Sequence, residues 1–171
     1  SKAALERAVA NTGKTGQPVI RLADIVTEKT LVNGLVGLLA TGGSTNHTLH
    51  LVAMAAAAGI RIDWDDFSEL STAVPLLARV YPNGEADVNR YHAAGGNAYV
   101  FRELLDAGLM HGDLPTIVDG GMARYGQEPK LDGDRIRYEP GPTASGDDSV
   151  LRPVSAPFEA HGGLRLLRGN L

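Results

Sequence analysis

The chain has 171 residues, with 16 Lys and Arg against 20 Asp and Glu, and it contains no Cys. The length and the mixed charges describe one globular unit, and a net charge of −4 argues against a nucleic-acid partner, because phosphate binding needs a basic face. The absence of Cys excludes disulfides, thiolate metal ligands and cysteine nucleophiles within this chain.

The sequence predicts neither a membrane span nor an export signal. The longest apolar run, residues 49–59, is interrupted by His50 and is shorter than the run of about 20 residues that crosses a bilayer. The first residues do not show the charged, apolar and small-residue regions of a signal peptide. We therefore expect a cytoplasmic location.

The first forty residues predict two helices. Residues 1–11 are rich in Ala, Leu and Arg and predict a helix that ends at Asn11-Thr12-Gly13. A short extended piece, residues 18–22, follows. After it, an apolar face of helical spacing is formed by Leu31, Leu35, Leu38 and Leu39.

A glycine pair separates this helix from the next one. Gly42-Gly43 breaks the chain, and Ser44 or Thr45 is a natural N-cap for a helix that ends at Gly59. A short extended run leads from there to Asp63, which, like Asp65, can cap a helix through Leu70.

The middle of the chain is less regular. Residues 76–81 fit a strand or a helical turn equally. Residues 87–109 predict a helix that is interrupted at Gly95-Gly96, and residues 116–125 predict one more short helix.

Pro, Gly and charged residues dominate after Lys130. Short extended pieces are expected at residues 135–138, 150–154 and 164–167, and residues 141–148 predict a mobile linker. The expected fold class is α/β to α+β, mainly helical in the first two-thirds with a few short strands, and rich in β-structure and loops towards the C-terminus.

Four motif matches carry little weight. Gly13-Lys14-Thr15 imitates the end of a phosphate-binding loop, but no strand precedes it, and Asn46-His47-Thr48 matches a glycosylation sequon by chance. His47 and His50 have a spacing that suits metal ligation, but no acidic residue lies on their helix, so packed or hydrogen-bonded histidines are favoured. The acidic residues from Asp63 to Asp66 fit a helix N-terminus better than a calcium loop.

The segment from Thr41 to His47 is the best candidate for a ligand site. Two glycines allow a close approach of the backbone, and the helix start that follows leaves N–H groups free for an anion. The side chains of Ser44, Thr45 and Asn46 add polar contacts. The alternative is an ordinary glycine turn with a Ser44 cap, which needs no ligand.

The same residues carry a resemblance to a known family. The stretch TEKTLVNGLVGLLATGGSTNHTLHLVAMAAAAGIRIDWDDFSEL resembles the dihydroxy-acid and 6-phosphogluconate dehydratase family, in which GGSTN followed by LHL recurs. His47, IDWDDFSEL and RVYPNGEADVN resemble its phosphogluconate branch. HAAGG, RELLDAGLMHGD and HGGLRLLRGNL extend the resemblance over residues 18–171.

This resemblance implies that the chain is a central fragment of a larger two-domain enzyme. It places residues 1–125 in the helical part of the N-terminal catalytic domain, residues 126–149 in a linker, and residues 150–171 at the start of a β-rich C-terminal domain. The implied enzyme is a cytoplasmic homodimer that converts 6-phospho-D-gluconate to 2-dehydro-3-deoxy-6-phosphogluconate and water.

The implied chemistry uses groups that this fragment lacks. The family uses a 4Fe-4S type iron–sulfur cluster, a divalent metal and a serine base, and no residue of this chain matches their ligands, so we expect the fragment alone to bind no cofactor and to be inactive. What carries over is substrate binding or site shaping by Ser44, Thr45, Asn46 and His47.

Several alternatives stay open. By charge alone, Arg79, Arg90 and Arg102 are candidates for the carboxylate and phosphate of a sugar acid, although exposed arginines on solvated faces are more common. The parent enzyme can also be a dihydroxy-acid or other sugar-acid dehydratase. In a third view, the chain is an anion-binding or assembly module without catalysis.

Overall fold

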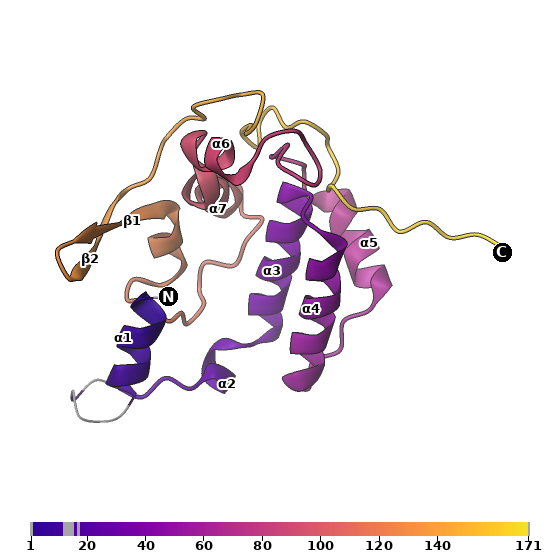
Figure 1. Cartoon of the computed structure of the whole chain (residues 1–171). Coiled ribbons are helices and arrows are strands. Elements are labelled where there is room, and N and C mark those ends of the chain that lie inside the picture. Colours follow the sequence, from indigo (N-terminus) through magenta and orange to yellow (C-terminus); the bar gives the residue numbers. More distant parts are fainter. Residues whose placement is uncertain (1, 12–15, 17, 171) are drawn as a thin grey trace.

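The computed structural model describes residues 2–11, 16 and 18–170 and consists mainly of helices, as predicted (Figure 1). The structure also contains a two-stranded antiparallel sheet. The elements are α1 (Lys2–Ala10), α2 (Leu22–Ile25), α3 (Glu28–Thr41), α4 (Thr45–Ala57), α5 (Trp64–Ala73), α6 (Val88–Ala93), α7 (Gly96–Asp106), the 3₁₀ helix η1 (Gly121–Gly126), β1 (Gln127–Asp132) and β2 (Arg135–Pro140).

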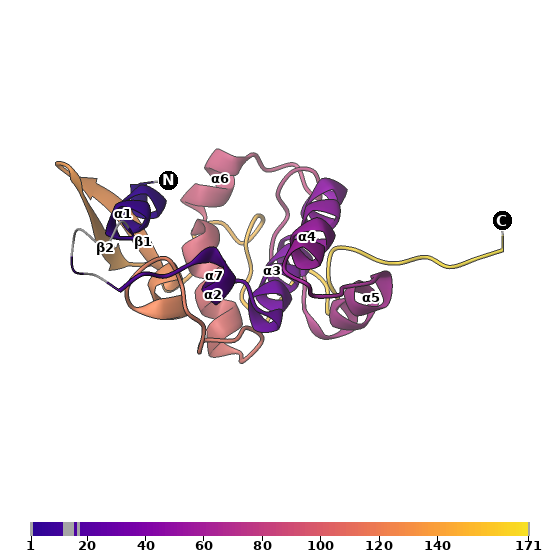
Figure 2. The same ribbon diagram turned by 90° about the horizontal axis from the view of Figure 1, so that it is seen from below.

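Helix α3 is the centre of the fold. The Thr27 hydroxyl caps its N-terminus by accepting a hydrogen bond from the Thr30 N–H. The predicted leucine face is confirmed, since Leu31, Leu35, Leu38 and Leu39 are all buried. Figure 2 shows α7 on one side of α3 and α4 with α5 on the other, which explains how α3 joins two apolar clusters.

The two clusters use different faces of α3. The larger one packs α3 against α7, residues 74–78 and the pair Val150 and Leu151. The smaller one brings Leu35 and Leu38 of α3 together with Leu51 of α4 and Phe67 of α5. Burial of these side chains is the main stabilising contribution, at about 25 cal/mol per Å² of apolar surface.

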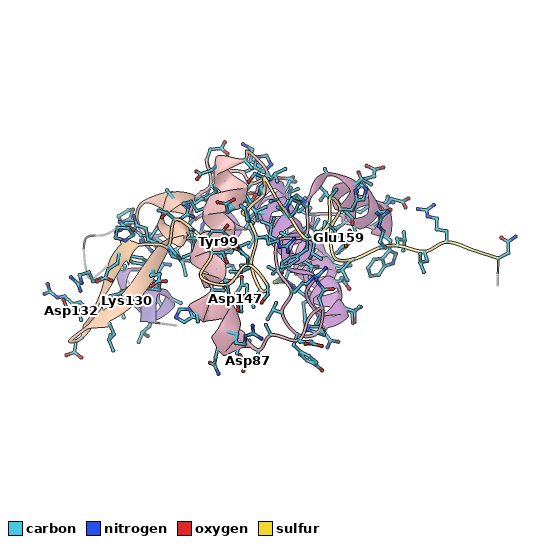
Figure 3. All side chains as sticks on the ribbon, turned by 90° about the horizontal axis from the view of Figure 1, so that it is seen from above. Asp87, Tyr99, Lys130, Asp132, Asp147 and Glu159 are labelled. Atoms are coloured by element: carbon cyan, nitrogen blue, oxygen red, sulfur yellow. The ribbon has the colours of Figure 1, made fainter. Side chains whose placement is uncertain are left out.

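Residues 76–80 are extended and are held by isolated bridges, which decides the alternative that the sequence left open. Leu76 pairs with Glu159 and Ala78 with Leu151, both antiparallel, and Val80 pairs with Ala86. In Figure 3, Glu159 marks the C-terminal segment that runs over the helices, while Lys130 and Asp132 mark the hairpin at the opposite end of the molecule.

Some predicted boundaries need correction. The helix that was expected to end at Leu70 continues to Ala73, and the predicted helix over residues 116–125 is wrong for its first half. Only Gly121–Gly126 is helical there, and it is a 3₁₀ helix. The physical reason is that Gly120 and Gly121 adopt positive φ angles of 97° and 63°, which break an α-helix.

The β-structure forms one hairpin. β1 pairs with β2 in the register Gln127 opposite Pro140 and Asp132 opposite Arg135, so β2 contains the predicted extended piece 135–138, whereas β1 was not predicted. The hairpin lies within residues 126–149, the stretch that was assigned to a linker, and the division into domains stays a prediction.

Residues 141–148 lie against α6 and α7. The Gly146 N–H donates to the Ala94 carbonyl oxygen at 2.9 Å, and Asp147 forms an ion pair with Arg90 at 2.8 Å. The Gly13-Lys14-Thr15 motif and the expected helix end at Thr12 lie outside the described residues. None of the described helices is long and apolar enough to cross a membrane.

Candidate functional site

The turn between α3 and α4 has the predicted architecture. Gly42 ends α3 in the left-handed conformation, with a φ of 61°, and its N–H donates to the Leu38 carbonyl oxygen at 2.8 Å. Ser44 is the N-cap of α4, and its hydroxyl accepts a hydrogen bond from the Asn46 N–H at 3.2 Å. The predicted cap and helix start are therefore confirmed.

Part of the space that the glycines open is filled by the chain itself. A Cβ atom on Gly42 would overlap the side chain of Asn83, and one on Gly163 would overlap the Gly42 backbone. At Gly43, a Cβ would lie 2.9 Å from a Leu38 methyl group and 3.9 Å from Nδ1 of His47. The glycine pair thus has a packing role whether or not a ligand also approaches it.

The four predicted site residues lie on the first turn of α4 with different surroundings. Ser44 is half-buried, whereas Thr45, Asn46 and His47 are exposed. The structure gives the Asn46 side chain no hydrogen bond to any described residue, so its amide group is free for another partner. Of the four, His47 alone lines a described cavity.

This cavity lies between α3 and α7 and has a volume of about 480 Å³. Apolar side chains dominate its lining, and its polar members come from both helices, the start of α4 and the segment before η1. Some polar members already have partners: the Thr41 hydroxyl donates to the Gly37 carbonyl oxygen at 2.7 Å, and Asn33 exchanges two hydrogen bonds with the His111 backbone. His47 lies both in the lining of this cavity and on the first turn of α4, directly after the glycine turn.

His47 is exposed as a residue, but its imidazole ring is partly desolvated where it borders the cavity, and this desolvation lowers its pKa; the nearby His50 lowers the pKa further. Both effects disfavour the imidazolium. At neutral pH, His47 is therefore a neutral imidazole that can donate one hydrogen bond and accept another, and it does not attract an anion by charge.

We expect His47 to titrate below the ordinary histidine value of about 6.5 when followed by NMR. Replacing His50 by Gln should raise the pKa of His47 only partly, because burial is the larger cause. Since the folded state disfavours the proton, the contribution of His47 to stability is complete above the unfolded pKa and is lost as the pH falls from there through the lower folded pKa. A His47 pKa at or above the ordinary value would contradict this account.

The chain does not provide a metal centre in the region that the structure covers. No group of three or more His, Cys, Asp or Glu side chains there is arranged to hold a metal ion, so His47 and His50 do not form part of such a group. With no Cys in the sequence, the thiolate donors of an iron–sulfur cluster are also missing from this chain.

The structure separates the three candidate arginines. Arg90 forms its ion pair with Asp147, and Arg102 donates to the Pro142 carbonyl oxygen and lies 3.9 Å from a Glu103 oxygen. Arg79 has no ion pair with any described residue, and its guanidinium lies over the Phe158 ring. Of these three arginines, only Arg79 has a guanidinium charge that no described carboxylate pairs with, so it is the one best able to bind an anion.

Comparison with known proteins identifies the family. The sequence-family model described as dihydroxy-acid/6-phosphogluconate dehydratase N-terminal matches residues 1–125. The chain belongs to this family. The match contains the glycine turn, the start of α4 and every lining residue of the cavity between α3 and α7.

Relatives in this family are 37–55% identical to the chain over the residues that align with it. A phosphogluconate dehydratase of Pseudomonas aeruginosa is 55% identical over 89% of the chain and 25% of the relative, and one of Zymomonas mobilis is 51% identical over 100% of the chain and 28% of the relative. A chloroplastic dihydroxy-acid dehydratase of Arabidopsis thaliana is 37% identical over 86% of the chain and 22% of the relative. The chain thus spans about a quarter of the length of these relatives.

Proposed function

We propose that this chain is part of a hydro-lyase that converts 6-phospho-D-gluconate to 2-dehydro-3-deoxy-6-phosphogluconate and water. The observation that carries the proposal is the difference in identity, 50% or more to several phosphogluconate dehydratases against 37% to the dihydroxy-acid dehydratase. A dihydroxy-acid or other sugar-acid dehydratase is the alternative within the same family.

The reaction needs an electrophile for the hydroxide that leaves C3 and a base for the proton that leaves C2. The described residues provide no metal cluster, and the sequence has no Cys. On the resemblance to the family, we propose that the iron–sulfur cluster, the divalent metal and the serine base of the enzyme are held by other parts of the protein, and we assign no step of the chemistry to this chain.

The role we assign to this chain is substrate binding by Ser44, Thr45, Asn46 and His47. The proposal is supported by the exposure of three of these residues and by the free amide group of Asn46. The first turn of a thirteen-residue helix also presents N–H groups and a positive dipole end, which favour an anionic sugar acid. The neutral imidazole of His47 suits a sugar hydroxyl.

The full-length enzyme is further proposed to be a cytoplasmic homodimer. Exposed apolar side chains on α4 and at the start of α5, such as Leu49, Met54 and Trp64, support an assembly role for this side of the molecule. This observation also favours the second candidate function, a module that helps to assemble the enzyme and has no chemistry of its own.

The test compares the full-length protein with the 171-residue chain in an assay for the 2-keto acid product. The full-length protein should form this product from 6-phosphogluconate and much more slowly from a branched dihydroxy acid, and the isolated chain should form none. A preference for the branched dihydroxy acid would favour the alternative substrate, and activity of the isolated, cluster-free chain would contradict the proposal.

A further inference from the structure

Two arginines that are distant in the sequence, Arg79 and Arg152, lie over the same aromatic ring, that of Phe158. The Cζ atom of Arg79 lies 4.5 Å from the centre of the Phe158 ring, and that of Arg152 lies 4.4 Å from the same centre. We call these three residues the arginine–phenylalanine cluster. Each contact is short enough for a cation–π interaction, which holds both guanidinium groups in place.

Backbone hydrogen bonds fix all three residues to one extended segment, residues 76–79. The Arg79 N–H donates to the Val150 carbonyl oxygen at 2.9 Å, the Arg152 N–H to the Leu77 carbonyl oxygen at 2.9 Å, and the Phe158 N–H to the Leu76 carbonyl oxygen at 2.9 Å. Because Leu76 and Leu77 are buried, the base of the cluster is rigid. The guanidinium groups therefore lose little conformational entropy when they bind a ligand.

The charge of this cluster is not neutralised within the described chain. Neither Arg79 nor Arg152 has an ion pair with a described residue, whereas Arg7, Arg21, Arg61, Arg90, Arg102, Arg137 and Arg168 all do. Among the described residues, the two guanidinium groups form one hydrogen bond, from Nε of Arg152 to the Asp148 carbonyl oxygen at 3.1 Å. Most N–H donors of the two guanidinium groups are thus free, and Arg79 is exposed.

The surroundings define the side from which an anion can approach. Arg152 also lines a hollow of about 500 Å³ together with Glu103 and Asp148, whose carboxylates repel an anion there. Arg79 does not line that hollow. Because Arg79 is exposed and does not line that hollow, we expect an anion to approach the cluster on the side of Arg79.

We propose that the arginine–phenylalanine cluster binds the phosphoryl group of a phosphorylated small molecule. The two guanidinium groups beside one ring match a phosphate monoester dianion in charge, and the planar fork of each offers paired N–H donors to phosphate oxygens; a carboxylate carries only one negative charge. Asn83, on the loop that follows Arg79, packs on Gly42, so the same loop region connects the cluster to the proposed substrate-binding turn. That the ligand is a sugar-acid phosphate rests on the proposed function.

The experiment is an NMR titration of the 171-residue chain with inorganic phosphate, and separately with acetate at equal ionic strength. We expect saturable shifts at Arg79 and Arg152 with phosphate and clearly weaker ones with acetate. Arg79→Gln and Arg152→Gln should each weaken phosphate binding about fivefold or more, and Phe158→Leu should weaken it less, because the charges remain but lose their fixed orientation. The control is Arg165→Gln, which removes an equal charge from an exposed residue.

The outcomes separate this proposal from the proposed function. If Arg165→Gln weakens phosphate binding as much as Arg79→Gln does, the binding depends only on net charge. If acetate binds as tightly as phosphate, the cluster has no preference for a phosphoryl group. Either result overturns the proposal, and so does a folded chain that binds no phosphate. In the full-length protein, Arg79→Gln should raise the KM for 6-phosphogluconate. An active full-length enzyme with an unchanged KM would leave the proposed reaction standing and reject the phosphoryl site.

Discussion

Replacing Asn46 by Ala in the full-length protein should reduce turnover or substrate binding by more than about tenfold, which corresponds to about 1.4 kcal/mol or more. The reason is that Asn46 presents an amide group without a described partner on the first turn of α4, beside the Ser44 cap. A helix cap needs only Ser44, so the exposed polar side chains that follow it are available for a substrate.

The same substitution should leave the fold intact. Asn46 is exposed, and the hydrogen bond that it gives to Ser44 comes from its backbone N–H, which alanine keeps. The free energy of unfolding should therefore change by less than about 0.5 kcal/mol. Steady-state kinetics and urea denaturation measure the two effects separately.

A matched control is Asn89→Ala, which removes the same amide group from an exposed position on α6. This control should leave both rate and stability unchanged. If Asn46→Ala also leaves the rate unchanged, the glycine turn and the start of α4 are a packing feature and the proposed substrate contacts are wrong.

Local sequence signals predict the centre of this fold because they act over a few residues. The leucine spacing of α3 specifies its buried face, the glycine at position 42 specifies the left-handed end of α3, and Ser44 specifies the start of α4. Each signal is a property of one turn of backbone, and each of these elements formed as predicted.

The extended segment 76–80 could not be predicted in this way. Its backbone N–H groups donate to carbonyl oxygens that are distant in sequence: Leu76 to Glu159, Arg79 to Val150, and Leu77 to Ala40 near the end of α3. The segment also lacks the alternating pattern of a half-buried strand, because the consecutive residues Leu76, Leu77 and Ala78 are all buried. The 3₁₀ form of η1 likewise depends on two glycines whose φ angles the sequence does not specify.

The same limit applies to the arginines. Charge alone does not distinguish Arg79, Arg90 and Arg102 from one another, and Arg152 is not among the candidates that the sequence suggests. Only tertiary contacts show that Asp147 neutralises Arg90 and that Arg152 shares the Phe158 ring with Arg79. A sequence signal that could have helped is an arginine followed within a few residues by an aromatic residue, as with Arg152 and Phe158.

Replacing Gly163 by Ala should destabilise the chain by about 1–3 kcal/mol, the typical cost of inserting an atom into packed structure. A Cβ atom there would overlap the Gly42 backbone and would lie 3.0 Å from a Leu76 methyl group. Gly42 cannot move away freely, because its own left-handed conformation ends α3 and its other side faces Asn83. The Gly163 N–H also donates to the Leu39 carbonyl oxygen at 2.9 Å, which holds the two backbones together.

The control for this prediction is Gly169→Ala. Gly169 has no atom within 4 Å of an added Cβ and has no positive φ angle, so its substitution should change the free energy of unfolding by less than about 0.5 kcal/mol. Thermal or urea denaturation measures both variants. Because the overlap at Gly163 falls on Gly42, NMR shifts of the Ser44 to His47 amides should change in Gly163→Ala alone. Equal stability of the two variants would mean that the C-terminal segment does not pack on the glycine turn, and the turn would then be supported by Asn83 and α3 alone.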